Sequence, residues 1–115
     1  MNTVCRLITL SEAEKMQTYP IDPQPGDMWY CQEYITRWPE DLSKYYKEHN
    51  SHRPPLMIIL PGGYWWMLDG MACENGKTYG EGWQVIGEPP KLTVYPSIHL
   101  VGRWHGHLTD GVLIG

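Results

Sequence analysis

Glycine and proline interrupt this chain so often that long helices are excluded. The sequence holds 12 Gly and 10 Pro in 115 residues, and both residue types end or bend regular structure outside a few special positions. The clearest regular signal lies at residues 56–68, where LMIIL and YWWML flank Pro61-Gly62-Gly63. Two apolar runs around such a turn predict a β-hairpin. Because LMIIL is apolar on both faces, we expect it to be a central strand.

Two short helices are predicted before this hairpin. Ser11 followed by Glu14 is the pattern of a capping box and predicts a helix that ends before Tyr19. Pro39 is suited to the first position of a second helix, which runs to about His49.

The other regular segments have the length and composition of strands. They are expected at residues 3–10, 27–34, 83–86, 92–95, 103–109 and 112–114, with a type I′ turn at Asp110-Gly111. The expected fold class is therefore mainly β (α+β): one small antiparallel sheet, partly closed, with one or two short helices packed on it. The whole chain, residues 1–115, has the length of a single domain.

The composition argues against some classes of binding partner and indicates the cellular compartment. The formal net charge of −4 argues against non-specific binding to nucleic acid or to a membrane surface, because both require clustered Lys and Arg. Three cysteines without a Cys-x-x-Cys pair favour free thiols in a reducing compartment. Neither a signal peptide nor a membrane-spanning run is recognised. We therefore expect an intracellular, soluble protein.

Aromatic residues supply the first candidate site. The chain has no Phe but has 6 Trp and 8 Tyr, so some Trp side chains must fill the core. Trp65 and Trp66 point to opposite faces of a strand, and one of them is expected in the core. Exposed Trp and Tyr are common in binding hot spots and in base-stacking platforms. The candidate binding residues are Tyr64, Trp65, Trp66, Lys77, Tyr79, Arg103 and Trp104, of which Lys77 and Tyr79 lie in a polar, Gly-rich loop at residues 69–82.

Histidines supply the second candidate site. His105 and His107 are two residues apart on a predicted strand and so leave the same face. With His99, and with Cys73 from the loop, they have the residue types of a zinc site. The other interpretation is that they are half-exposed strand histidines with ordinary hydrogen bonds, and both interpretations stay open.

Catalysis has weaker support than binding. Neither Ser97 nor Cys73 lies in a nucleophile motif, and Ser97 after Pro96 is expected at a turn or bulge. The acidic pair Glu40-Asp41 falls in the first turn of a predicted helix, where it complements the helix dipole. We therefore expect that the protein is not an enzyme.

The stretch GWQVIGEPPKLTVYPSIHLVGRWHGHLTDGVL at residues 82–113 resembles a family of small tailed-bacteriophage and prophage proteins of unknown function. Its Pro96-Ser97-Ile98 strand and His-bearing hairpin carry the resemblance most specifically. The resemblance implies a phage (viral) protein acting in the host bacterial cytoplasm. More distant members have cysteines that suggest zinc, whereas this chain keeps only Cys73 in the middle loop and has no cysteine in the last strands.

Three functions follow as hypotheses. The first is a binding protein that inhibits or sequesters a host protein, including one of the host-defence (immune) machinery, through the aromatic surface and the Gly-rich loop. The second is a nucleotide or small-ligand binder, with Trp66 or Trp104 stacking on a base and Arg103 or Lys77 meeting phosphate. The third is a zinc-binding domain or metal-dependent enzyme that uses His99, His105 and His107.

Overall fold

The mainly β architecture is confirmed, with the strands divided between two sheets instead of one. The computed structural model describes residues 2–49, 53–68 and 84–115. The five-stranded sheet has the order β1 (Asn2–Val4), β9 (Val112–Ile114), β8 (Trp104–Thr109), β7 (Lys91–Leu100) and β6 (Gln84–Glu88). The four-stranded sheet has the order β2 (Arg6–Leu7), β3 (Asp27–Tyr30), β4 (Leu56–Leu60) and β5 (Tyr64–Met67). Neighbouring strands are antiparallel except β2 and β3, which are parallel.

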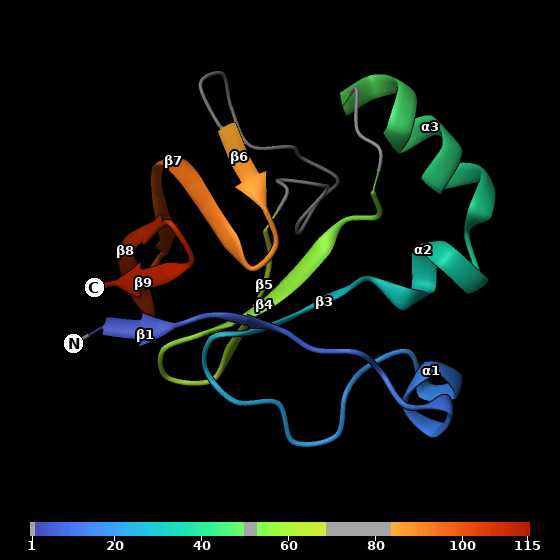
Figure 1. Cartoon of the computed structure of the whole chain (residues 1–115), viewed down its shortest axis with the longest axis horizontal. Helices are drawn as coiled ribbons and strands as arrows, with labels where there is room; N and C mark the ends of the chain where they lie inside the picture. Colours follow the sequence, from blue (N-terminus) through green and yellow to red (C-terminus); the bar gives the residue numbers. More distant parts are fainter. Residues whose placement is uncertain (1, 50–52, 69–83) are drawn as a thin grey trace.

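Three short helices lie on one side of the molecule, away from the five-stranded sheet (Figure 1): α1 (Glu12–Gln17), α2 (Gln32–Thr36) and α3 (Pro39–His49). Ser11 and Glu14 form the expected capping box of α1, each side chain accepting a hydrogen bond from the other's backbone N–H. The helix α3 packs beside α2 and does not lie across a sheet face. None of the described helices is long and apolar enough to cross a membrane.

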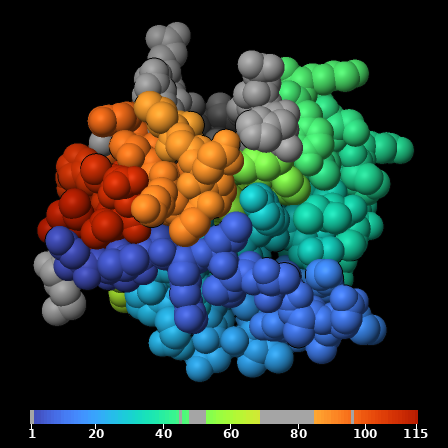
Figure 2. Space-filling view, in the orientation of Figure 1, coloured from blue at the N-terminus to red at the C-terminus, as the bar shows by residue number. Residues whose placement is uncertain are grey.

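The first strand passes from one sheet to the other at Cys5. A single strand is expected at residues 3–10, but Cys5 separates β1, which pairs with β9, from β2, which pairs with β3. The Cys5 N–H donates to the Gly111 carbonyl at 2.8 Å, and the next N–H, of Arg6, donates to the Gly26 carbonyl at 3.0 Å. Figure 2 shows this N-terminal segment running from the C-terminal strands to the start of α1. One continuous backbone thus belongs to both sheets.

The main core lies between the two sheets. Along β4, the alternating residues Leu56, Ile58 and Leu60 face this core and are fully buried. The five-stranded sheet contributes Leu92, Val94, Ile98, Leu108 and Leu113. As expected, β4 is a central strand, with β3 on one side and β5 on the other.

The other face of the four-stranded sheet is covered as well, by a smaller cluster. Trp29 and Ile59 point away from the main core and pack with Leu10, which lies just before α1. Both faces of β4 are therefore buried, which explains why LMIIL is apolar at every position.

Asp27 stabilises the segment next to Cys5, where the chain passes from one sheet to the other. Its carboxylate is buried and accepts hydrogen bonds from the Arg6 guanidinium and from the Gln24 N–H, the latter at 2.8 Å. Burial by itself raises the pKa of Asp27, but these two hydrogen bonds and the charge of Arg6 outweigh burial and hold the pKa below its ordinary value. The preceding residue, Gly26, has a φ of 91°, and a Cβ there would lie 2.7 Å from the Val4 carbonyl oxygen. Only glycine fits this turn without strain.

The ordinary value for an Asp carboxyl is a pKa of about 3.9. Because the folded-state pKa of Asp27 is lowered, its contribution to stability is complete above that value and is lost as the pH falls through the folded-state pKa. Asp27→Asn should therefore lower the free energy of unfolding by about 2 kcal/mol at pH 7, and by less at pH 3. Urea denaturation at both values measures this difference. Glu12→Gln changes an exposed carboxylate and is the control, and an equal cost of Asp27→Asn at both values would contradict the role of its charge.

Candidate functional site

The turn between β4 and β5 places Tyr64 at one end of the molecule. Gly62 has a φ of 94°, and a Cβ on it would lie only 2.6 Å from the Tyr64 ring. The absence of that Cβ allows the ring to lie against the turn. The glycines that predict the hairpin therefore also fix the position of this aromatic side chain.

Arg103 meets Tyr64 from the other sheet. It follows Gly102, which has a φ of 75°, and its N–H donates to the Leu100 carbonyl at 2.9 Å, closing the β7–β8 turn. The guanidinium carbon lies 5.4 Å from the centre of the Tyr64 ring, within the range of a cation–π contact. This contact joins the turns of two hairpins that belong to different sheets.

Trp104 is half-buried next to Arg103. Along β8, Trp104, Gly106 and Leu108 share the inward face, and the indole packs against the edge of the main core. A Cβ on Gly106 would lie 2.6 Å from this ring, so glycine at position 106 makes room for the indole. The position of Trp104 is thus set by packing, and part of its surface stays exposed.

Two of the three predicted histidines form a pair on the outer face of the hairpin. His99 on β7 lies opposite His105 on β8, with ring centroids 4.6 Å apart. The hydroxyl oxygen of Ser97 lies 3.3 Å from His105 Nε2, within hydrogen-bond distance. The register of β7 shifts between Val94 and Ile98, so Ser97 lies in the irregular segment expected of it, although its hydroxyl meets a side chain and not the backbone.

His107 does not complete a metal site with these two. By strand alternation it lies on the same face as His105, where both are exposed. Within residues 2–49, 53–68 and 84–115, no group of three or more His, Cys, Asp or Glu side chains is arranged to hold a metal ion. The expected three-histidine set is therefore not assembled by the described residues, and its fourth candidate, Cys73, lies outside them.

We define the hairpin-tip surface as Tyr64, His99, Arg103, Trp104 and His105. The last four of these residues border an open hollow of about 240 Å³.

Comparison with known proteins finds no matching family model, no similar curated protein and no similar solved structure.

The two tryptophans next to Tyr64 have different positions, as their alternation predicts. Trp66 is 9% exposed and belongs to the main core, so it is the member of this pair that fills the core. Trp65 points to the opposite face and is 47% exposed. Its ring packs edge-on against Trp29, at 5.1 Å between centroids, and against Tyr19, at 6.1 Å. Trp65 thus belongs to a second aromatic surface and does not contribute to the hairpin tip.

The loop that carries the remaining candidates, Lys77 and Tyr79, lies outside the described residues. Tyr19 and Ser97 are among the described residues with partners that sequence reasoning does not find. Tyr19 follows a predicted helix end, and its contact with Trp65 joins segments far apart in the chain. Ser97 is assigned only a turn role by its sequence, because the cross-strand register that brings it to His105 cannot be read from local sequence.

The positions of the two tryptophans give a direct test of this arrangement. Trp66→Ala should lower the free energy of unfolding by about 4 kcal/mol, because it opens a cavity between the sheets. Trp65→Ala should cost about 1 kcal/mol, because nearly half of that side chain is already exposed. Chemical denaturation of the two variants measures the difference. Equal costs, or a larger cost at Trp65, would contradict the assignment of Trp66 to the core.

Proposed function

We propose that this protein is a binding protein that recognises an acidic surface of another protein through its hairpin-tip surface. The observation that carries this proposal is the stacking of Arg103 on Tyr64, with half-buried Trp104 beside it. Arg, Tyr and Trp are the residues most enriched in protein–protein hot spots. Here packing and glycine turns hold the two aromatic rings in place, so little side-chain entropy is lost on binding.

Charge supports an acidic partner. Residues 96–109 contain Arg103 and three histidines but no Asp or Glu, although the whole chain carries a net charge of −4. Arg103 therefore carries the formal charge of this stretch, and a positive charge on an acidic protein favours encounter with an acidic patch.

The phage resemblance suggests the biological setting of the proposal. A phage protein that acts in the bacterial cytoplasm meets host proteins as its partners, and a small binding protein inhibits or sequesters such a partner by covering its surface. We include host-defence proteins among these partners. This setting rests on analogy with the phage family and not on the geometry of the tip.

A nucleotide is the second candidate ligand of the same surface. The open hollow is bordered by half-buried Trp104, a residue type that stacks on bases, and by Arg103, a residue type that binds phosphate. We favour Trp104 over Trp66, the other base-stacking candidate, because Trp66 is buried in the main core. Titration of the intrinsic Trp fluorescence with a panel of nucleotides tests this candidate.

The main proposal is tested by affinity capture from bacterial lysate at micromolar bait concentration, with captured proteins identified by mass spectrometry. The wild type should retain an acidic protein, and Arg103→Glu should reduce its retention at least tenfold because the charge at the tip is reversed. Lys47→Glu makes the same charge change on exposed α3, away from the tip, and should leave retention unchanged.

Two results would contradict the proposal. One is capture of no protein by the wild type. The other is equal retention by the wild type and Arg103→Glu, which would show that binding takes place elsewhere on the molecule.

A further inference from the structure

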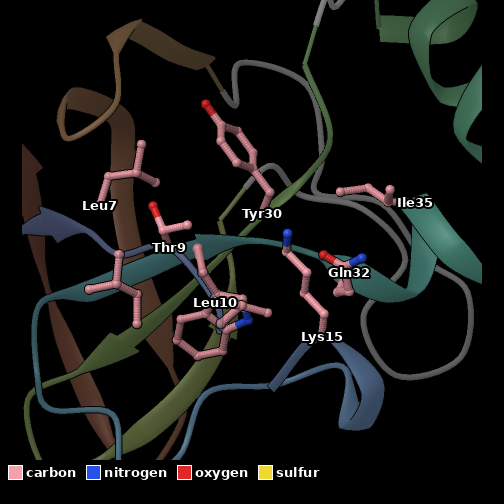
Figure 3. A pocket seen from close by; sticks show the side chains of 9 residues that line it. Leu7, Thr9, Leu10, Lys15, Tyr30, Gln32 and Ile35 are labelled. Carbon is pink, nitrogen blue, oxygen red and sulfur yellow. The ribbon is translucent and has the colours of Figure 1, made fainter. Parts of the chain in front are cut away.

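A second concave site lies on the far side of the four-stranded sheet from the main core. It is a pocket of about 300 Å³ between the segment that follows β2, the helix α1 and the junction of β3 with α2 (Figure 3). It shares no lining residue with the hairpin-tip surface. Its volume is at the lower end of the range for small-molecule sites.

The floor of the pocket is apolar and rigid. Trp29 is 1% exposed, Leu10 is also buried, and both belong to the smaller core cluster on this face of the sheet. Ile8 packs against the same cluster and lines the pocket. Trp29 and Leu10 support the pocket from beneath, and half-buried Ile8 and exposed Ile35 offer the apolar surface that a ligand can cover.

Gln32 brings an unusual polar group to this apolar site. The residue is 8% exposed, and its side-chain carboxamide makes no hydrogen bond with any residue of the described chain. Among the described residues, Gln32 also accepts a hydrogen bond at its main-chain carbonyl, from the Thr36 hydroxyl. Because Gln32 lines the pocket, its amide N–H groups and carbonyl oxygen are available to a ligand there.

Lys15 supplies a positive charge next to this amide. Figure 3 shows its side chain extending from α1 into the pocket, toward the start of α2, where Gln32 lies. Its ion pair with Glu12, at 3.5 Å, involves a carboxylate that is 94% exposed. Such surface pairs contribute little free energy, so the Lys15 ammonium can change partner at low cost.

We propose that this pocket binds a small monocarboxylic acid with an apolar body. The carboxylate lies between the Lys15 ammonium and the Gln32 amide N–H, and the apolar body covers Ile8 and Ile35. One ammonium and one neutral amide match a single negative charge, whereas a phosphate ester carries up to two charges and usually takes several cationic or backbone donors. The proposal is independent of protein binding at the hairpin tip, because the two sites have no residue in common.

The test uses octanoate, with octan-1-ol as an uncharged probe of the same chain length, in isothermal titration calorimetry. Wild-type protein should bind octanoate at least tenfold more tightly than octan-1-ol. Lys15→Met removes the charge and keeps the length of the side chain, and it should weaken octanoate binding at least tenfold with little effect on octan-1-ol. Gln32→Glu puts a like charge against the carboxylate and should have the same effect on octanoate.

Two control variants locate the site. Lys47→Met removes an exposed lysine from α3, and Arg103→Glu changes the hairpin tip; both should bind octanoate as the wild type does. The proposal is overturned if octanoate does not bind at millimolar concentration, if octan-1-ol binds equally well, or if Lys15→Met leaves octanoate affinity unchanged. A similar loss in Lys47→Met would also overturn it, since binding would then follow overall charge.

Discussion

The arrangement of this protein depends on the passage of one backbone segment between two sheets at Cys5. The Cys5 N–H bonds to Gly111 at the end of the five-stranded sheet, and the Arg6 N–H bonds to Gly26 at the start of β3. Burial is the main cause that raises the pKa of the Cys5 thiol to about 11, so this side chain stays neutral and packs in the core as a small apolar group. The two sheets are thereby held in one orientation at this end of the molecule.

The packing of the two sheets against each other also forms the hairpin-tip surface. Tyr64 belongs to the four-stranded sheet and Arg103 to the five-stranded sheet, so their stacking requires both sheets to keep their positions. Alternation along β5, in register with β4, places Trp66 beside Ile58 in the main core and Trp65 beside Ile59 on the opposite face. The smaller cluster on that face supports the proposed acid-binding pocket.

The parts of the fold that sequence predicts well are those determined by near neighbours. The capping box at Ser11, the Pro39 helix and the hairpin around Gly62 each depend on residues within a few positions, and each is confirmed. The parts that it misses depend on distant residues. Cys5 interrupts a predicted strand because its N–H and the next one donate to Gly111 and Gly26, and α2 begins at residue 32, although the strand is predicted to continue to residue 34.

The candidate sites show the same difference between features set by neighbouring residues and features set by distant ones. Alternation along β5 and β8 correctly separates Trp65 from Trp66 and puts His105 and His107 on one face. The pairing of Arg103 with Tyr64, however, requires the relative position of two sheets, which no local pattern encodes. The sequence does not predict a role for Lys15 or Gln32 either. Each is an ordinary residue of a short helix, and only the tertiary fold brings the two residues to one pocket.

Amide hydrogen exchange tests most directly whether the two sheets form one cooperative unit joined at Cys5. The amides of Cys5 and Arg6 should exchange only through global unfolding, with the same opening free energy as the amide of Ile58 in β4. If instead Cys5 and Arg6 exchange through a lower-energy opening while Ile58 stays protected, the sheets are held together elsewhere. That result would contradict the dependence of the hairpin-tip surface on the crossover at Cys5.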